Sequence, residues 1–180
     1  MDYPVILLGA GGHAKVLLDM LTEQNSKIIG VTVAEPNIDE KFFCDIPIIG
    51  GDEKILDYNP ENIRLVNGVG SVGSTALRKK IYEKFKNLGY KFRSVIHTSA
   101  IISANVICRE VQVMAGAVIN SGSVIEENSI INTGALIDHD CKIGKHVHIA
   151  PGTVMSGGVK IGAGSHIGVG STIIQGVSIG

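Results

Sequence analysis

The second half of the chain repeats every six residues, and this repeat constrains the fold more than any other feature of the sequence. An aliphatic residue or methionine stands at every sixth position from Val95 to Ile179, fifteen positions in succession. Small or β-branched residues often precede these markers by two positions, and glycine often follows them by three. Residues two apart on a short strand share a face, and glycine tolerates the positive φ of a tight bend. The pattern therefore predicts short strands and corners that wind into a parallel β-helix.

The step of six also predicts how the coils stack. Three steps make one coil if the cross-section is triangular, so that residues 18 apart lie roughly 4.8 Å above one another. The markers would then point inward, where each buried isoleucine contributes ~1.5–3 kcal/mol relative to an exposed one. Residues 95–180 amount to nearly five such coils. Solenoids normally end in a capping element, so we expect a C-terminal cap to lie beyond Gly180.

Residues 1–94 follow a different pattern, in which strands alternate with helices. Apolar runs at 5–8, 28–33, 46–49 and 63–66 predict strands, and helical spacing runs up to Leu21 and again over 76–88. This alternation implies a parallel α/β sheet. About 90 residues supply half of a doubly wound fold, so we predict a half-Rossmann domain over 1–94. It would join the β-helix domain of 95–180 without a flexible linker.

A glycine-rich turn separates the first predicted strand from the first predicted helix. It contains Gly9, Gly11, Gly12 and His13 and fits the pattern G-x-G-x-x-A. Such a loop lets backbone amides approach a phosphate at a helix N-terminus, so we predict a nucleotide-sugar site there. A tight structural turn is the alternative. Glu35, after the second strand, could bind a ribose or a base, or could be a solvated loop charge.

Composition excludes several classes of partner. The 16 basic and 17 acidic side chains give a formal net charge of −1, whereas nucleic acid or an acidic membrane surface attracts a basic excess. Aromatic residues make up 4% and tryptophan is absent, which disfavours base stacking. Three cysteines without metal-type spacing indicate neither a disulfide framework nor a zinc site. The apolar run at 5–8 is too short for a signal peptide or membrane span, so we expect a cytoplasmic protein.

The six-residue register places His139 and Asp140 at a corner of the predicted β-helix, away from its interior. An imidazole with a pKa near 6.5 can accept a proton from an amine or a hydroxyl at neutral pH. Eighteen residues later come Gly157 and Gly158, so the next coil carries no side chains above the pair. This gap could admit a thioester, and an exposed backbone amide there could stabilise an oxyanion. A corner histidine without a function is the alternative.

Two further histidines and one cysteine have predictable positions in this register. His148 and His166 are 18 apart and should stack outward on one flat face. They could line an acetyl-CoA cleft, contact a neighbouring subunit or bind a metal ion. Cys141 should point inward as a small core residue rather than act as a nucleophile.

Taken together, the two halves resemble the sugar O- and N-acetyltransferases of the sialic-acid acetyltransferase group. This group includes bacterial enzymes that acetylate a UDP-linked amino sugar. The matching segments, in order, are GAGGHAK, IPIIGGD, RKKIYEKFKNLGYKF, SVIHTSA and INTGALIDHDCKIGKHVHIAPG. The resemblance implies a left-handed β-helix, acetyl-CoA as co-substrate, and a homotrimer with its sites at subunit boundaries.

The resemblance also implies roles for individual residues. His139 would be the general base and Asp140 would orient its imidazole. His148 would contact acetyl-CoA, and the amide of Gly157 would serve as the oxyanion donor. The loop from Gly9 to His13 would contact the nucleotide sugar.

The sequence departs from the family pattern after the second strand, where many members carry two aspartates and this chain has Ala34-Glu35. The identity of the nucleotide therefore depends on the resemblance, which implies UDP. We predict acetyl transfer to the amine of such a nucleotide-linked amino sugar. Alternatives are O-acetylation of a sialic acid or another sugar hydroxyl, a β-helical metalloenzyme that uses several of the histidines, and a non-catalytic scaffold.

Overall fold

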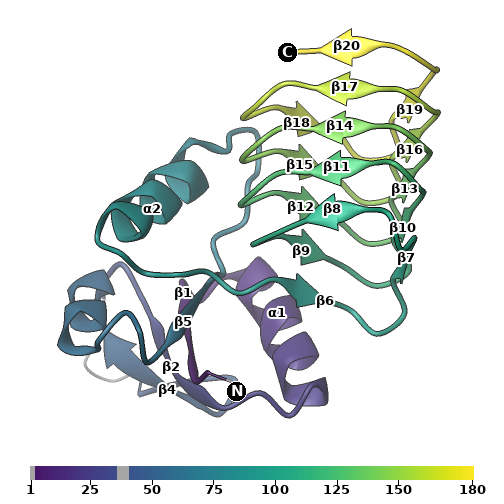
Figure 1. Ribbon diagram of the computed structural model, residues 1–180. Helices are drawn as coiled ribbons and strands as arrows, with labels where there is room; N and C mark the ends of the chain where they lie inside the picture. The colour runs from purple at the N-terminus through teal and green to yellow at the C-terminus, as the bar shows by residue number, and fades with distance from the viewer. Residues whose placement is uncertain (1–2, 36–40) are drawn as a thin grey trace. The chain divides into compact units, whose positions relative to one another are not determined.

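The computed structural model describes residues 3–35 and 41–180, and their contacts divide the chain into two units (Figure 1). Met1–Gly70 and Lys80–Arg93 form the first, which we call the α/β unit. Ser71–Lys79 and Ser94–Gly180 form the second, which we call the repeat unit. The short segment 71–79 therefore belongs to the repeat unit, although it lies before the domain boundary that the sequence predicts near residue 94.

The α/β unit contains a sheet in the order β3-β4-β2-β1-β5. Strands β1 (Val5–Leu8), β2 (Ile28–Thr32), β4 (Ile46–Gly50) and β5 (Arg64–Asn67) are parallel, as predicted. Helix α1 (Gly12–Glu23) follows β1, the 3₁₀ helix η1 (Asp52–Asp57) follows β4, and helix α2 (Ala76–Asn87) follows β5. The antiparallel edge strand β3 (Phe42–Phe43) was not predicted, because its turn uses Cys44 and Asp45 at positive φ rather than glycine.

One apolar cluster of the α/β unit forms between its sheet and the C-terminal part of α2. Ile6 and Leu8 of β1 and Leu65 of β5 are fully buried in one cluster with Phe85. Tyr90 belongs to the same cluster, and its Oη donates a hydrogen bond to the Ile55 carbonyl at 2.8 Å. Among the described residues, none of the helices is both long and apolar enough to cross a membrane.

The repeat unit is a left-handed parallel β-helix with three sheets of five parallel two-residue strands. The sheets are named after their middle strands. The β13 sheet holds β7 (Ile101–Ile102), β10 (Val118–Ile119), β13 (Leu136–Ile137), β16 (Val154–Met155) and β19 (Thr172–Ile173). The β14 sheet holds β8 (Ile107–Cys108), β11 (Val124–Ile125), β14 (Lys142–Ile143), β17 (Lys160–Ile161) and β20 (Ser178–Ile179). The β12 sheet holds β6 (Val95–Ile96), β9 (Gln112–Val113), β12 (Ile130–Ile131), β15 (His148–Ile149) and β18 (His166–Ile167). Figure 1 shows these strands stacked coil upon coil.

The interior of the β-helix is built as the repeat predicts from Val113 onward. The second residue of each strand points into one continuous apolar cluster, and so does the residue two positions before it where that residue is apolar. Cys141 is fully buried in that cluster, which confirms its predicted place in the core. The corner glycines three residues after the markers have positive φ, for example 76° at Gly122 and 69° at Gly158.

The first coil is one residue shorter than the others, and this corrects the predicted register. Ile119 lies beside Ile102, 17 residues away, so Ile102 faces the core. Ile101 and Ile107 are 65% and 60% exposed, and the prediction that these two markers point inward is wrong. Adjacent aliphatic residues, as at Ile101-Ile102, fit either register, so the sequence pattern did not reveal the shift.

The segment Ser71–Lys79 packs on the outside of the β-helix. The Oγ1 of Thr75 donates a hydrogen bond to the Gly164 carbonyl at 2.8 Å, and Nε of Arg78 donates to the Asn128 carbonyl at 3.2 Å. Arg78 is 2% exposed, and burial lowers the pKa of its guanidinium to about 9. Asn128 in turn donates to Nδ1 of His146 at 3.0 Å. His146 is therefore part of a buried structural contact.

Candidate active site

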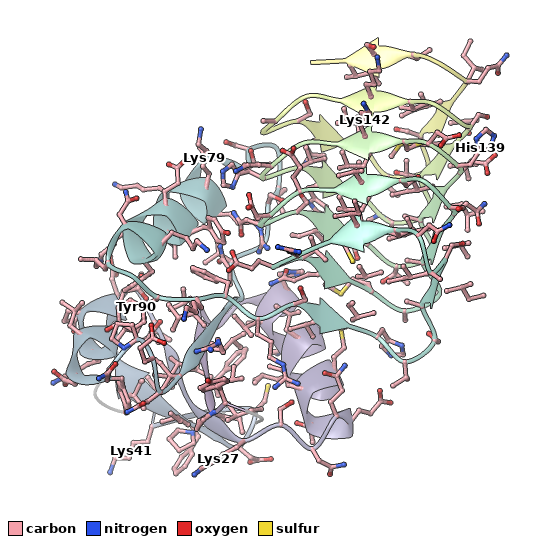
Figure 2. All side chains as sticks on the ribbon, viewed as in Figure 1. Lys27, Lys41, Lys79, Tyr90, His139 and Lys142 are labelled. Atoms are coloured by element: carbon pink, nitrogen blue, oxygen red, sulfur yellow. The ribbon has the colours of Figure 1, made fainter. Side chains whose placement is uncertain are left out.

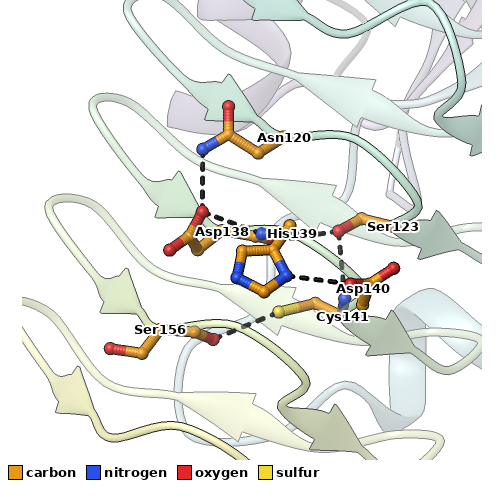
Figure 3. A network of polar contacts seen from close by, with 7 residues as sticks. All are labelled: Asn120, Ser123, Asp138, His139, Asp140, Cys141 and Ser156. Atoms are coloured by element: carbon orange, nitrogen blue, oxygen red, sulfur yellow. Dashed lines mark hydrogen bonds and ion pairs between the residues drawn. The ribbon is translucent and has the colours of Figure 1, made fainter.

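His139 and Asp140 lie together at the corner between β13 and β14, outside the interior as predicted (Figures 2 and 3). Nδ1 of His139 is 2.8 Å from Oδ2 of Asp140, and the two side chains are 62% and 71% exposed. A carboxylate can only accept a hydrogen bond, so Nδ1 carries the ring proton of the neutral imidazole. Nε2 therefore keeps a lone pair that can accept a proton.

The backbone of this corner is strained at Asp140. Its φ is 60°, in a region that Gly122 and Gly158 occupy at the same position of the neighbouring coils. A residue other than glycine costs about 1–3 kcal/mol in such a conformation. The Asp140 side chain reaches over Gly122, where an added Cβ would collide with Oδ1 of Asp140. The carboxylate is therefore held beside the imidazole by a residue whose backbone adopts a conformation that favours glycine.

A second carboxylate, Asp138, stabilises the corner from the other side of the ring. Its Oδ1 accepts hydrogen bonds from Nδ2 of Asn120 at 3.0 Å and from the His139 amide at 2.9 Å (Figure 3). These hydrogen bonds lower the pKa of Asp138. The hydrogen bond to Asp140, followed by the negative charge of Asp138, raises the pKa of His139. The imidazole is thereby a stronger base than an isolated histidine.

Gly157 leaves room for the imidazole itself, which differs from the empty gap that we expected above the pair. An added Cβ at Gly157 would lie 2.6 Å from both Cε1 and Nε2 of His139. Ser156 and Gly158 donate their amides to the carbonyls of Ile173 and His139. Within the described part of the chain, the amide of Gly157 has no such acceptor. The Gly157 amide is therefore available as a donor, and Gly157 itself lies against the imidazole that carries the basic nitrogen.

His148 lies in β15 and is 8% exposed. Nδ2 of Asn132 donates a hydrogen bond to Nε2 of His148 at 3.0 Å, so the ring proton of His148 is on Nδ1. Nδ1 donates to the Ser71 carbonyl at 3.1 Å and lies 2.7 Å from Oγ of Ser71. The ring packs against that of His166, with centroids 4.7 Å apart and planes inclined by 57°, and the two residues lie one above the other as the register suggested. Both ring nitrogens are thus occupied within the chain, and the contact of His148 with acetyl-CoA stays a prediction. Neither Ser71 nor Asn132 carried a sequence signal for this contact.

Burial lowers the pKa of His148 to about 4, which makes the stability of the repeat unit sensitive to acid. The unfolded chain takes up a proton below the ordinary pKa of about 6.5, whereas the folded chain does so only near 4. Stability is therefore present above pH 6.5 and is lost as the pH falls toward 4. We expect the free energy of unfolding to drop by about 2 kcal/mol more in the wild type than in His148→Gln over this range. Urea unfolding at several pH values measures this; equal slopes in the two proteins would refute it.

The described residues contain no cluster of side chains that matches the metalloenzyme alternative. Among residues 3–35 and 41–180, no group of three or more histidine, cysteine, aspartate or glutamate side chains is placed to hold a metal ion. His139 lies at a different corner from His146, and His148 is engaged with Ser71 and Asn132. The histidines therefore do not converge on one point in this structure.

In the α/β unit, the glycine loop connects β1 to the N-terminus of α1 as predicted. Gly9 has a φ of 91°, and an added Cβ would be 3.0 Å from Cγ2 of Val69. Gly11 precedes α1 as its N-cap without a side-chain cap, and the first turn of the helix holds no acidic residue. Apart from the adjoining residues and the backbone of α1 itself, no described atom lies within 4 Å of where a Cβ would stand at Gly11 or Gly12. The space beside Gly11 and Gly12 at this helix start could therefore admit an anion.

The sheet order adds a second loop to this site that the sequence analysis missed. Strand β1 lies between β2 and β5, and ligands of such sheets bind at the carboxyl ends where the strand order reverses. The loop Gly68–Gly70 follows β5, and Gly68 donates its amide to the Leu8 carbonyl at 2.8 Å. An added Cβ at Gly70 would be 3.2 Å from Cβ of His13. The run NGVG at the end of β5 is the sequence feature that could have indicated this second loop.

Glu35 is exposed and lies three residues after β2 ends. Because β2 is parallel to β1, Glu35 follows the same carboxyl edge of the sheet as the glycine loop. Residues 36–40 after it lie outside the described residues.

Comparisons with known proteins agree with both units. The model of the PglD N-terminal domain matches residues 4–85, and the model of bacterial transferase hexapeptide repeats matches 122–157 and 140–175. A histidine mutant of perosamine N-acetyltransferase from Caulobacter crescentus, in complex with CoA and GDP-perosamine, is 33% identical with a TM-score of 0.89, covering 99% of this chain and 83% of that chain. The acetyltransferase domain of PglB from Neisseria gonorrhoeae FA1090, in complex with acetyl coenzyme A, is 27% identical with a TM-score of 0.71, covering 99% and 96%. This chain belongs to the family of hexapeptide-repeat sugar acetyltransferases in which a PglD-type N-terminal domain precedes the β-helix.

Proposed function

We propose that this protein transfers the acetyl group of acetyl-CoA to the amine of a nucleotide-linked amino sugar, with His139 as the general base. The exposed His139–Asp140 pair carries this proposal, because Asp140 holds Nδ1, Nε2 is left to accept a proton, and the imidazole lies against Gly157. The 33% identical perosamine N-acetyltransferase was solved with CoA and GDP-perosamine, which supports an amino sugar as acceptor. The PglB domain was solved with acetyl coenzyme A, which supports the donor.

The chemistry follows from the positions of these groups. The neutral amine attacks the thioester carbon, and the new C–N bond turns the carbonyl oxygen into an oxyanion. The amide of Gly157 donates a hydrogen bond to that oxyanion, which lowers the barrier. Nε2 of His139 takes the proton from the nitrogen, while Asp140 holds the resulting imidazolium. The C–S bond then breaks, and the CoA thiolate leaves and takes up the proton, so that the enzyme returns to its starting state.

The α/β unit would bind the nucleotide sugar through its glycine loops. The space beside Gly11 and Gly12 at the start of α1 is open, and the positive end of a helix favours a pyrophosphate. We expect Gly12→Ala to raise the Kd for the nucleotide sugar by about tenfold, because its methyl group would stand in the path of the phosphate. The Kd for acetyl-CoA should not change. Calorimetric titration with each ligand tests this. An unaltered Kd for the nucleotide sugar would show that the glycine loop does not contribute to the nucleotide-sugar site.

For the nucleotide we propose GDP in place of the UDP that the family resemblance implied. Glu35 presents a carboxylate that can accept two parallel hydrogen bonds. The Watson–Crick edge of guanine offers two neighbouring donors, whereas that of uracil offers one donor between two acceptors. The relative in complex with GDP-perosamine supports the same choice.

The choice of nucleotide can be tested with the same sugar linked either to GDP or to UDP. We expect the GDP-linked form to bind at least about tenfold more tightly than the UDP-linked form, and Glu35→Gln to reduce that ratio. Equal affinities, or a ratio that Glu35→Gln leaves unchanged, would contradict the assignment of Glu35 to guanine.

The acceptor atom can be tested by product analysis. An amino sugar and its hydroxyl analogue, on the same nucleotide, are incubated with acetyl-CoA and the thiol released is followed. We expect an amide product from the first and no turnover of the second. Esterification of the hydroxyl analogue at a comparable rate would favour the O-acetyltransferase alternative.

We further propose that the repeat unit assembles as a homotrimer through the β13 sheet. The outward residues of this sheet are apolar in four of the five strands, and Ile101, Leu136 and Val154 are 65%, 41% and 38% exposed. The His139 corner begins where β13 ends, so that a second copy on this sheet would lie beside the dyad. Sedimentation equilibrium should give three times the mass of the chain, and a monomer would contradict this.

A further inference from the structure

We propose that Ser123 is a positioning residue for the general base, an inference that rests on the proposed function. Ser123 lies in the coil that precedes His139 and is fully buried. Its hydroxyl donates a hydrogen bond to the Asp138 carbonyl at 2.8 Å and accepts one from the Cys141 amide at 3.0 Å (Figure 3). Asp138 and Cys141 are the two ends of the corner that carries the dyad. One hydroxyl therefore ties both ends of that corner together.

The hydroxyl of Ser123 has direct consequences for His139. Removing it leaves a carbonyl and an amide without these partners beside the apolar core, and the corner can relieve this only by moving. The peptide of Asp138 is bonded to His139, so such a movement displaces the imidazole relative to Gly157. A displacement of about 1 Å is enough to lower a reaction rate by ~10²-fold.

The position of Ser123 is chemically distinct along its own edge of the β-helix. The stacked residues at intervals of 18 are Ser123, Cys141, Val159 and Val177. Cys141 donates through Sγ to the Ser156 carbonyl at 3.4 Å, a longer contact under the next corner. The valines have no hydrogen-bonding group. On this edge the hydroxyl bridge stands under the corner that holds His139.

A matched control exists at another corner of the same β-helix. Ser129 is also fully buried, donates to the Gly144 carbonyl at 2.9 Å and accepts from the Val147 amide at 3.1 Å. Its corner holds neither His139 nor Gly157. Ser123→Ala and Ser129→Ala therefore remove the same pair of hydrogen bonds, and only the first acts on the dyad.

The two variants should separate a positioning role from a structural one. We expect similar decreases in Tm, while Ser123→Ala alone lowers kcat by about 10- to 100-fold, with the KM values of both substrates nearly unchanged. Ser123→Thr should restore kcat, because Thr153 already donates through Oγ1 to the Gly168 carbonyl at 3.2 Å at the equivalent place of a third corner. The imidazole titration of His139, followed by NMR without any substrate, should shift in Ser123→Ala and not in Ser129→Ala.

Two results would overturn this inference: equal losses of kcat in both variants, or an unchanged kcat and His139 titration in Ser123→Ala. If the alanine variants do not fold, Ser123→Cys and Ser129→Cys allow the same comparison, since Cys141 shows that a thiol fits such a position. A wild-type protein that acetylates no amino sugar would contradict the proposed function alone. The NMR comparison would still decide whether Ser123 positions the ring.

Discussion

Replacing His139 with alanine should lower kcat for acetyl transfer by about 10²–10⁴-fold, the contribution expected of a general base. Without the imidazole, the attacking amine has no group to take its proton as the C–N bond forms. The imidazole is 62% exposed, so the fold should remain intact without it. Release of the CoA thiol with saturating nucleotide sugar measures the rate.

The same variant should bind its substrates normally, and this separates catalysis from binding. We expect the Kd of the nucleotide sugar to change by less than about twofold, because the contacts proposed for its nucleotide part lie in the α/β unit. Asp140→Asn serves as a graded control that keeps the imidazole but removes the charged partner of Nδ1. A His139→Ala protein with the wild-type rate would exclude His139 as the base.

Adding a single methyl group at Gly157 should reduce kcat by about 10²-fold. The new Cβ would be 2.6 Å from Cε1 and Nε2 of His139, so the ring would have to leave its position beside Asp140. The φ of Gly157 lies outside the left-handed region, and alanine can adopt its backbone conformation. The loss would therefore come from the displaced ring rather than from a strained corner.

Gly168→Ala is the control for this substitution. The Cβ at Gly168 would be 3.8 Å from Oγ of Ser171, an ordinary contact, and the backbone again permits alanine. We expect its kcat to stay within about twofold of the wild type. If Gly157→Ala and Gly168→Ala were equally active, the imidazole would not depend on the space above Gly157.

The repeat register could be predicted from the sequence because it is a strict spacing rule. Eighteen residues separate Val113 from Ile131 and Ile131 from Ile149, and the structure stacks them as expected. The same rule placed His139 and Asp140 at a corner and Cys141 in the core. It failed in the first coil, because the pair Ile101-Ile102 fits two registers. The core-facing strand residue before Val113 precedes it by five positions instead of six, so Ile102 and not Ile101 faces the core.

The contacts that hold the site could not be predicted in the same way. The register gives the position of a backbone, but the place of a ring depends on its rotamer, so the imidazole over Gly157 was not foreseen. Ser123 had the pattern of an ordinary small core residue, and its role depends on two backbone groups of the next coil. The contact of Ser71 with His148 joins residues 77 apart, which no local pattern encodes.

The pH dependence of kcat/KM, measured beside an NMR titration of the His139 ring, tests the central claim most directly. The imidazole must be neutral to accept a proton, so activity should rise as the pH passes the pKa of His139, which Asp140 and Asp138 raise above its ordinary value. In Asp140→Asn, the NMR titration and the acidic limb of the profile should move together to lower pH. A ring that titrates lower in Asp140→Asn while the activity profile stays in place would show that His139 is not the base.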